Sequence, residues 1–230
     1  TLGLWGPQAK NALGHFIDPN EISIENFPFA AAKNLTLNLA EGKKIDVWAS
    51  RISYVGESGW EIYLNNDSEE GLALYDSLLE IGVVPVGIET YANSRRLEKS
   101  FRLQGADLET EYNACESAIE RRLVKEADFH GKAAHLAHRE EEPSAILCTM
   151  TIDDLNVSGS MRYPVGNSPI IDPASGEVPI DSKGRRSYAT GMSYCPSIKK
   201  FVVMGYLPKN LAVPGKSLLL EYFNENGDGV

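Results

Sequence analysis

Short runs of alternating apolar and polar residues fill the first third of the chain, and this two-residue period is typical of half-buried β-strands. The polar stretch Glu41-Gly42-Lys43-Lys44 separates two of these runs and predicts a turn. Pro7 suits the first position of a helix, so we expect a helix over Gln8 to Phe16. The predicted strands cover Thr1 to Gly6, Phe27 to Leu39, Ile45 to Ser53 and Trp60 to Leu64.

The pattern then changes to helical spacing, with leucines on one face and Gly82 where a helix would end. Val83 to Val86 is predicted to be a brief buried strand, and a helix is expected from about Glu89 to Phe101. This alternation of strands and helices favours a mixed α/β first region. The apolar helix positions and the candidate N-caps are Leu72, Leu74, Leu78, Leu79, Asn66 and Asp67.

A change of composition near residue 142 predicts a domain boundary. An alanine-rich helix is expected to follow Asp128 to Lys132 and to reach about Arg139. Glu140-Glu141-Glu142-Pro143 opposes its continuation through charge repulsion and proline, so we divide the chain into residues 1–142 and 143–230. The second region has strand-like runs between Gly and Pro turns, which predict a small C-terminal β-barrel or sandwich and hence an α+β fold. Its runs are Ala145 to Ile152, Ser187 to Ser193, Lys200 to Leu207 and Ser217 to Phe223.

Composition restricts the partners. The 230 residues are 43% hydrophobic and carry a formal net charge of −10, which repels polyanions and argues against a nucleic-acid partner. The three cysteines form no CxxC pair, which fits a reducing compartment. No apolar run approaches a membrane span, so we expect no membrane partner and a cytoplasmic protein, or one of the mitochondrial matrix in a eukaryote.

Several kinds of site are missing from the sequence. His135 and His138 share one face of the predicted helix, but no HExxH or cysteine cluster accompanies them, so we expect no metal site. No cysteine has the surroundings of an activated nucleophile. There is no GxSxG elbow, no GxxxxGK[ST] loop and no GxGxxG after a strand, so no phosphate cradle is expected.

The turn between the strands at Ile45 to Ser53 and Trp60 to Leu64 is the remaining candidate, because Tyr54 and Glu61 stand at its two shoulders. A carboxylate accepts two parallel N–H bonds, and the aminopyrimidinone edge of a pterin offers that pair of donors. Tyr54 would pack its ring against the same flat ligand. The residues alone leave a second interpretation open, in which Glu61 is an exposed hairpin charge and Tyr54 is structural.

Arg51 to Tyr63 resembles the R-x-[SG]-Y-[TV]-G-E-x-G-[WF]-E-[IL] segment of the glycine cleavage T-protein (aminomethyltransferase) family. Thr90 to Asn93 and Trp60 look most like the tetrahydrofolate-binding C-terminal region of dimethylglycine and sarcosine dehydrogenases. The further segments that match family motifs in the same order are Leu4 to Ala9, Arg96 to Phe101, Asn113 to Ile119, Asp128 to Lys132 and Thr190 to Pro196.

The resemblance implies a folate-binding, aminomethyltransferase-like α/β region followed by the small barrel. It implies that tetrahydrofolate accepts a methylene or aminomethyl unit from a small-molecule amine, which is dimethylglycine, sarcosine or a glycine derivative. Glu61 matches the carboxylate that recognises the pterin, Tyr54 matches the tyrosine that lines its pocket, and Arg96 keeps the arginine of the RLE motif. FAD is implied only for a flavin oxidase domain upstream in a parent chain.

Two departures limit what the resemblance implies. The catalytic aspartate of the family precedes the motif at Leu4 to Ala9, so the catalytic residue of this chain is unknown, and we expect either a fragment or a divergent member. Ala92 stands where aminomethyltransferases have the arginine of their GLGARD signature. Whether the chain alone is an enzyme therefore stays open, and the alternative is a non-enzymatic folate-binding module or a scaffold of the same fold.

Overall fold

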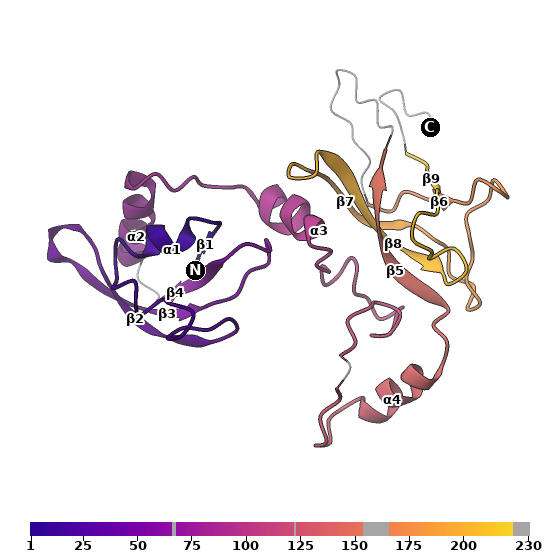
Figure 1. Cartoon of the computed structure of the whole chain (residues 1–230), viewed down its shortest axis with the longest axis horizontal. Coiled ribbons are helices and arrows are strands. Elements are labelled where there is room, and N and C mark those ends of the chain that lie inside the picture. Colours follow the sequence, from indigo (N-terminus) through magenta and orange to yellow (C-terminus); the bar gives the residue numbers. More distant parts are fainter. Residues whose placement is uncertain (66–67, 122, 154–165, 223–230) are drawn as a thin grey trace. The chain divides into compact units, whose positions relative to one another are not determined.

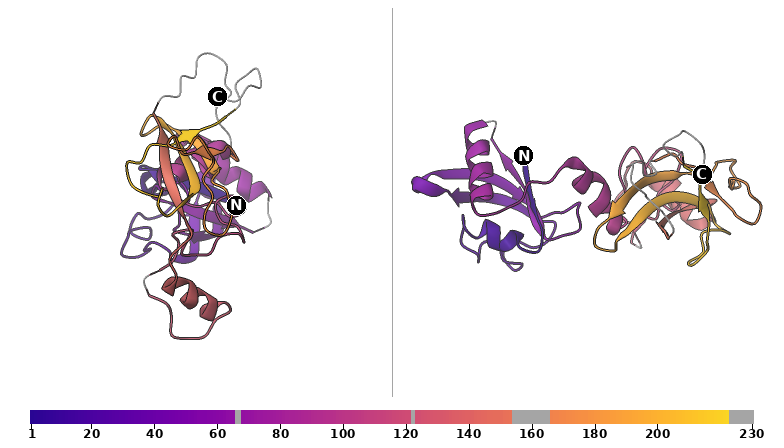
Figure 2. Two further views of the ribbon diagram at one scale, coloured as in Figure 1. Left: turned by 90° about the vertical axis from the view of Figure 1, so that its right-hand side faces the viewer. Right: turned by 90° about the horizontal axis from the view of Figure 1, so that it is seen from above.

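The computed structural model describes residues 1–65, 68–121, 123–153 and 166–222, and the chain divides into two compact units (Figure 1, Figure 2). Unit 1 is Thr1–Arg95 and unit 2 is Arg96–Val230. The domain boundary that the sequence predicts near residue 142 is a different division and stays a prediction. Each unit is described by itself.

Unit 1 contains a four-stranded antiparallel sheet with the order β1-β4-β3-β2. All four predicted strands are confirmed, although β2 begins later than expected, because Pro28 lacks the backbone N–H that a strand needs. In the register of β1 with β4, Leu4 lies opposite Trp60 and Gly3 lies opposite Glu61. The strands are β1 (Leu2–Trp5), β2 (Ala32–Asn38), β3 (Lys44–Ser50) and β4 (Gly59–Leu64).

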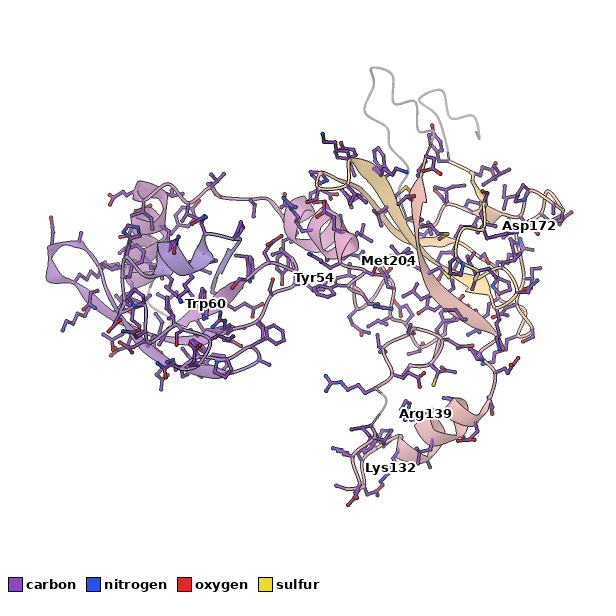
Figure 3. All side chains as sticks on the ribbon, viewed as in Figure 1. Tyr54, Trp60, Lys132, Arg139, Asp172 and Met204 are labelled. Carbon is purple, nitrogen blue, oxygen red and sulfur yellow. The ribbon has the colours of Figure 1, made fainter. Side chains whose placement is uncertain are left out.

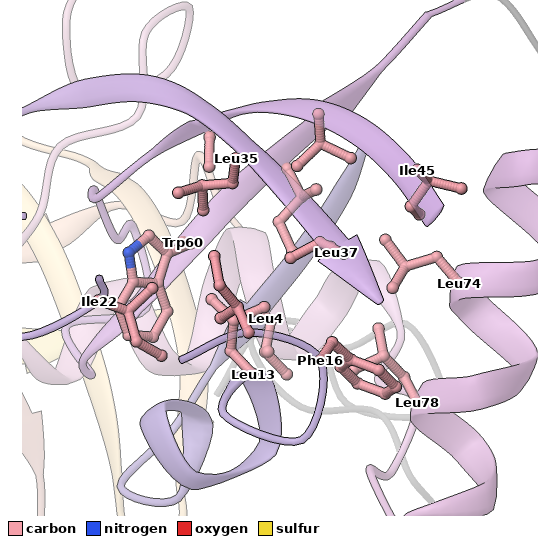
Figure 4. Close-up of a cluster of buried hydrophobic side chains, with 14 of the residues drawn as sticks. Leu4, Leu13, Phe16, Ile22, Leu35, Leu37, Ile45, Trp60, Leu74 and Leu78 are labelled. Atoms are coloured by element: carbon pink, nitrogen blue, oxygen red, sulfur yellow. The ribbon is translucent and has the colours of Figure 1, made fainter. Parts of the chain in front are cut away.

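Apolar side chains fill the space between this sheet and the helices of unit 1 (Figure 4). Leu13 comes from α1 (Ala9–Leu13), Leu37 from β2 and Leu74 from α2 (Ser68–Glu80), and all three are fully buried. Both helices were predicted, whereas the candidate caps Asn66 and Asp67 of α2 lie outside the described residues. The predicted turn between β2 and β3 contains a short 3₁₀ helix, η1 (Ala40–Gly42), and a π-helix, η2 (Glu89–Arg95), ends the unit.

The prediction of a buried strand at Val83 to Val86 is wrong. This segment has no regular secondary structure, and Val84 and Val86 are exposed. The sequence pattern is that of a buried strand, but among the described residues no neighbouring strand pairs with the segment. The predicted long helix after it is instead η2 followed by α3 (Arg96–Glu98), and the chain leaves helical structure after Glu98.

Unit 2 contains two separate sheets in its described part, one with the order β5-β8-β7 and one that pairs β6 with β9. The predicted closed barrel is not confirmed, because the described strands form a three-stranded and a two-stranded sheet and not one closed sheet. The runs at Ala145, Ser187 and Lys200 do form strands, and the last run shortens to two residues. The elements are α4 (Lys132–Glu140), β5 (Ala145–Ile152), β6 (Ile170–Ile171), β7 (Ala189–Cys195), β8 (Lys200–Pro208) and β9 (Leu219–Leu220).

Charged groups are buried inside unit 2. The guanidinium of Arg96 is paired with the fully buried Asp107, which also accepts hydrogen bonds from the hydroxyl of Thr190 and from the backbone N–H of Leu103. The hydroxyl of Tyr206 donates to the backbone carbonyl of Asp107 at 2.7 Å. Each of these buried polar groups therefore has a partner, as burial requires.

A second charged cluster centres on Glu116, which is 1% exposed. Its Oε1 accepts hydrogen bonds from Arg185 at 2.6 Å and from Lys183 at 3.2 Å, and Arg185 also pairs with Asp181 at 2.7 Å. Burial opposes ionisation of Glu116, but the bonds from Arg185, from the Asn113 backbone and from Lys183 outweigh it and lower its pKa to about 2. The same balance of burial against hydrogen bonds from Arg185 lowers the pKa of Asp181.

No helix in the described ranges has the length and apolarity needed to cross a membrane.

Candidate functional site

The loop between β3 and β4 places the two shoulder residues of the predicted site. Gly56 takes a φ of +72° in this loop, a conformation that glycine adopts without strain. Gly59 begins β4 against β1, where a side-chain Cβ would lie only 2.1 Å from the carbonyl oxygen of Leu4. The two glycines therefore turn the chain and let β4 approach β1 closely. Figure 3 labels Tyr54 of this loop and Trp60 of β4.

Glu61 is the third residue of β4 and is half-buried. It lies opposite Gly3 on β1, where a Cβ would stand 1.9 Å from the ring of Trp5, so the indole covers the position that a larger residue would fill. Tyr63 follows two residues later on the same face of the strand, and its hydroxyl donates a hydrogen bond to Oε2 of Glu61. This hydrogen bond raises the pKa of Tyr63, because it favours the protonated phenol.

Glu61 lines a cavity of about 500 Å³ in unit 1. The ring of Trp5 stacks on that of Tyr91 at 5.1 Å between centroids and 28° between planes, and both residues line the cavity. Burial, and then the charge of Glu61, raises the pKa of Tyr91, which is therefore a neutral phenol at physiological pH. The cavity thus offers one carboxylate beside flat aromatic surfaces, and its other walls are β1, α2 and the segment 83–88.

Tyr54 contacts this site through a neighbour. Its ring packs on Tyr91 at 5.4 Å between centroids, with the planes inclined by 54°, and the lining of the cavity does not include Tyr54 itself. The indole N–H of Trp5 donates to the carbonyl of Ile52 at 3.1 Å, which ties the loop to β1. The structure therefore brings Tyr54 and Glu61 to one region, and their roles toward a ligand stay predictions.

Arg96 lies in unit 2, where its side chain is 1% exposed. Besides Asp107, its Nη1 donates to the carbonyl of Phe101 at 3.0 Å and lies 3.5 Å from the sulfur of Met204, which Figure 3 labels. These contacts give Arg96 a packing role. A role of Arg96 in folate binding stays a prediction.

Trp5 and Tyr91 were not predicted as site residues. Trp5 belongs to the motif at Leu4 to Ala9 and Tyr91 to the run at Thr90 to Asn93, so both lay inside segments already recognised, without a chemical pattern that singled them out. Aromatic stacking between residues 86 positions apart in sequence becomes visible only in the fold.

The carboxylate of Glu61 and the rings of Trp5 and Tyr91 suit a planar organic ligand. A carboxylate accepts paired N–H donors, and the indole and phenol rings offer stacking surfaces to a heterocycle. Among the residues that the structure describes, no group of three or more His, Cys, Asp or Glu side chains gathers in a way that would hold a metal ion. The two histidines of interest, His135 and His138, lie on α4 in unit 2.

Comparison with known proteins places the chain in a family. The GCVT N-terminal domain family matches residues 1–126, more than half of the 230 residues. The chain belongs to this family. The kinship inferred from the motif at Arg51 to Tyr63 is therefore confirmed.

The relatives are longer than this chain. Human mitochondrial dimethylglycine dehydrogenase is 31% identical over 234 residues, a match that covers 98% of this chain and 24% of that protein. An aminomethyltransferase of Halothermothrix orenii is 26% identical over 222 residues, covering 95% of this chain and 56% of that protein. The chain thus spans about a quarter of the first relative and about half of the second.

A solved structure shares the fold. The crystal structure of glycine cleavage system aminomethyltransferase T from Bartonella henselae matches with a TM-score of 0.59 and 24% identity, over 80% of this chain and 46% of that one. At this identity the likeness supports the mixed α/β fold alone.

Proposed function

We propose that the Glu61 cavity of unit 1 binds the pterin ring of tetrahydrofolate. The observation that carries the proposal is the half-buried carboxylate of Glu61 beside the stacked rings of Trp5 and Tyr91, in a cavity of about 500 Å³. The carboxylate would accept two N–H bonds from the aminopyrimidinone edge, and the rings would cover the face of the heterocycle. Tyr54 would support Tyr91 from behind.

We propose further that the parent protein moves a methylene or aminomethyl unit from a small-molecule amine to this folate. The aminomethyltransferases and dimethylglycine dehydrogenases among the relatives support this reaction class. When bound, tetrahydrofolate supplies the nucleophilic N5, and the chain's own residues hold the pterin in one orientation, which lowers the entropic barrier of the transfer. A flavin oxidase domain in the parent chain and a cytoplasmic or mitochondrial location belong to the same proposal.

The alternative is a folate-binding module or scaffold without catalysis. The half-buried carboxylate of Glu61 and the stacked rings of Trp5 and Tyr91 support folate binding, which this alternative also requires. Both forms of the proposal share the folate site.

Calorimetric titration with tetrahydrofolate tests that site. Wild type is expected to bind saturably, and Glu61→Gln, which keeps the size of the side chain and removes its charge, is expected to weaken binding about 10- to 100-fold, the value of one or two charge-assisted hydrogen bonds. Glu57→Gln is the matched control, because it removes the same charge from the adjacent loop and does not line the cavity. Equal affinity in wild type and Glu61→Gln contradicts the site.

A second measurement separates the enzyme from the module. The full-length parent protein is incubated with dimethylglycine or sarcosine and tetrahydrofolate, and formation of 5,10-methylenetetrahydrofolate is followed. Product that depends on Glu61 supports transfer. Folate binding without product from any of these amines supports the module.

A further inference from the structure

An exposed apolar segment of unit 1 needs a partner. Between α2 and η2, the chain runs through Val84, Val86 and Ile88, whose side chains are 76%, 60% and 74% exposed. β-Branched side chains in succession are typical of a buried strand, and soluble domains seldom leave several of them together in water.

The segment and a strand at the end of the sheet line the same cavity. In the described residues β1 pairs with β4 alone and forms one end of the sheet order, so its outer edge keeps unpaired backbone N–H and C=O groups. The cavity is bounded by β1 on one side, by the segment 83–88 on another, and by Tyr75 and Leu79 of α2, which are 39% and 38% exposed. An unpaired edge beside an apolar floor is the arrangement that accepts an added strand.

We propose that an extended polypeptide segment with alternating apolar side chains pairs with β1 and covers Val84, Val86 and Ile88. Its source is polypeptide outside these 230 residues, of the kind that makes up the other 76% of human dimethylglycine dehydrogenase and the other 44% of the Halothermothrix orenii aminomethyltransferase. Backbone hydrogen bonds to β1 would give affinity, and alternate side chains would enter the apolar part of the cavity.

A polypeptide fits this surface better than a second small molecule does. The edge of β1 presents backbone groups at the repeat of a strand, and the apolar residues extend along a segment of several residues beside it. A small apolar ligand would satisfy the side chains and leave the backbone edge unpaired.

The test uses the full 230-residue chain and two recombinant fragments of human dimethylglycine dehydrogenase, one from each side of the stretch that this chain matches. Binding of the labelled fragments is measured by fluorescence anisotropy, and hydrogen exchange is followed at the amides of Leu2–Trp5. One fragment is expected to bind and to slow exchange in β1. The double variant Val84→Glu/Val86→Glu is expected to weaken that binding at least ~10-fold, since it places charges on the contact surface.

Val213→Glu is the matched control, because Val213 is 55% exposed in unit 2, so its substitution is expected to leave binding unchanged. Circular dichroism checks that the variants remain folded. Failure of both fragments to bind, or equal binding to the wild type and the double variant, overturns the proposal. A wild-type dimer that Val84→Glu/Val86→Glu dissociates overturns it as well, because a second copy of the chain then covers the segment. No folate enters these measurements, so they are independent of the proposed function.

Discussion

The two units bury different kinds of side chain. Among the described residues, the buried polar side chains of unit 1 are Ser50 and Ser94, and neither is charged. Those of unit 2 include four charged groups at 7% exposure or less, namely Arg96, Asp107, Glu116 and Asp181. Both units have apolar cores, and unit 2 adds buried charges that are paired with one another.

The difference in buried side chains predicts which perturbations should destabilise each unit. An apolar core responds to lost volume and is nearly indifferent to pH, whereas a buried ion pair fails when one partner is removed or neutralised. The three tryptophans, Trp5, Trp48 and Trp60, all lie in unit 1, so their fluorescence reports the unfolding of that unit. Hydrogen exchange measured on peptides from unit 2 reports the unfolding of unit 2.

Removal of Asp107 is expected to have the largest effect. Asp107→Ala leaves the guanidinium of Arg96 buried without its carboxylate and should destabilise unit 2 by about 3–5 kcal/mol. Urea unfolding followed by hydrogen exchange in unit 2 measures the loss. Asp153→Ala is the control, because its ion pair with Lys200 is 72% and 47% exposed and should contribute no more than about 1 kcal/mol. Equal losses in the two variants would show that burial adds nothing to the Arg96 pair.

Leu37→Ala tests the apolar core of unit 1. Leu37 is 0% exposed inside the apolar cluster that Figure 4 shows. Its truncation should therefore cost about 3 kcal/mol through lost burial and a residual cavity. Tryptophan fluorescence during urea unfolding measures it. Leu72→Ala, at a position of α2 that is 63% exposed, should change stability by less than about 1 kcal/mol.

Acid is expected to weaken unit 2 before unit 1. The pKa of Glu116 is lowered to about 2 in the folded protein from an ordinary value of 4.5, so its stabilising contribution is complete above about pH 4.5 and is lost as the pH falls toward about 2. Allowing for screening at the half-exposed Lys183, we expect a loss of about 2 kcal/mol. Urea midpoints of both units between those pH values measure it. In Glu116→Gln this part of the pH dependence of unit 2 should disappear, and an unchanged slope would assign it to other carboxylates.

Local patterns predicted much of the fold. The alternating runs placed β1, β3 and β4, and helical spacing with Gly82 placed α2, because each signal lies within one element. Closure of the predicted barrel could not be read in this way, since it depends on which strand edges meet. Val83 to Val86 failed for the same reason, because its pattern records burial but not the partner that provides it.

The residues of the candidate site also differ in how far they could be predicted from local sequence. Glu61 was found because one strand and one glycine turn present it, and the motif at Arg51 to Tyr63 gave it a ligand class. The neighbours that shape its surroundings, Trp5 and Tyr91, come from distant segments, so their stacking could not be predicted. Arg96 was selected by motif position alone, and the buried carboxylate of Asp107 that pairs with it lies in a segment without any sequence signature.

The smallest expected effect tests how completely apolar the core of unit 1 is. Trp60 is 0% exposed, and its indole N–H has no hydrogen-bond partner among the described residues. Trp60→Phe removes ring volume, which destabilises, and also removes a buried donor without an acceptor, which offsets that loss, so the net change should stay below about 1 kcal/mol. Trp5→Phe should cost more although Trp5 is less buried, because its N–H donates to Ile52. Circular dichroism during urea unfolding compares the two variants, with Trp48 retained in both. A loss above about 3 kcal/mol for Trp60→Phe would contradict the offset between the lost ring volume and the removed donor.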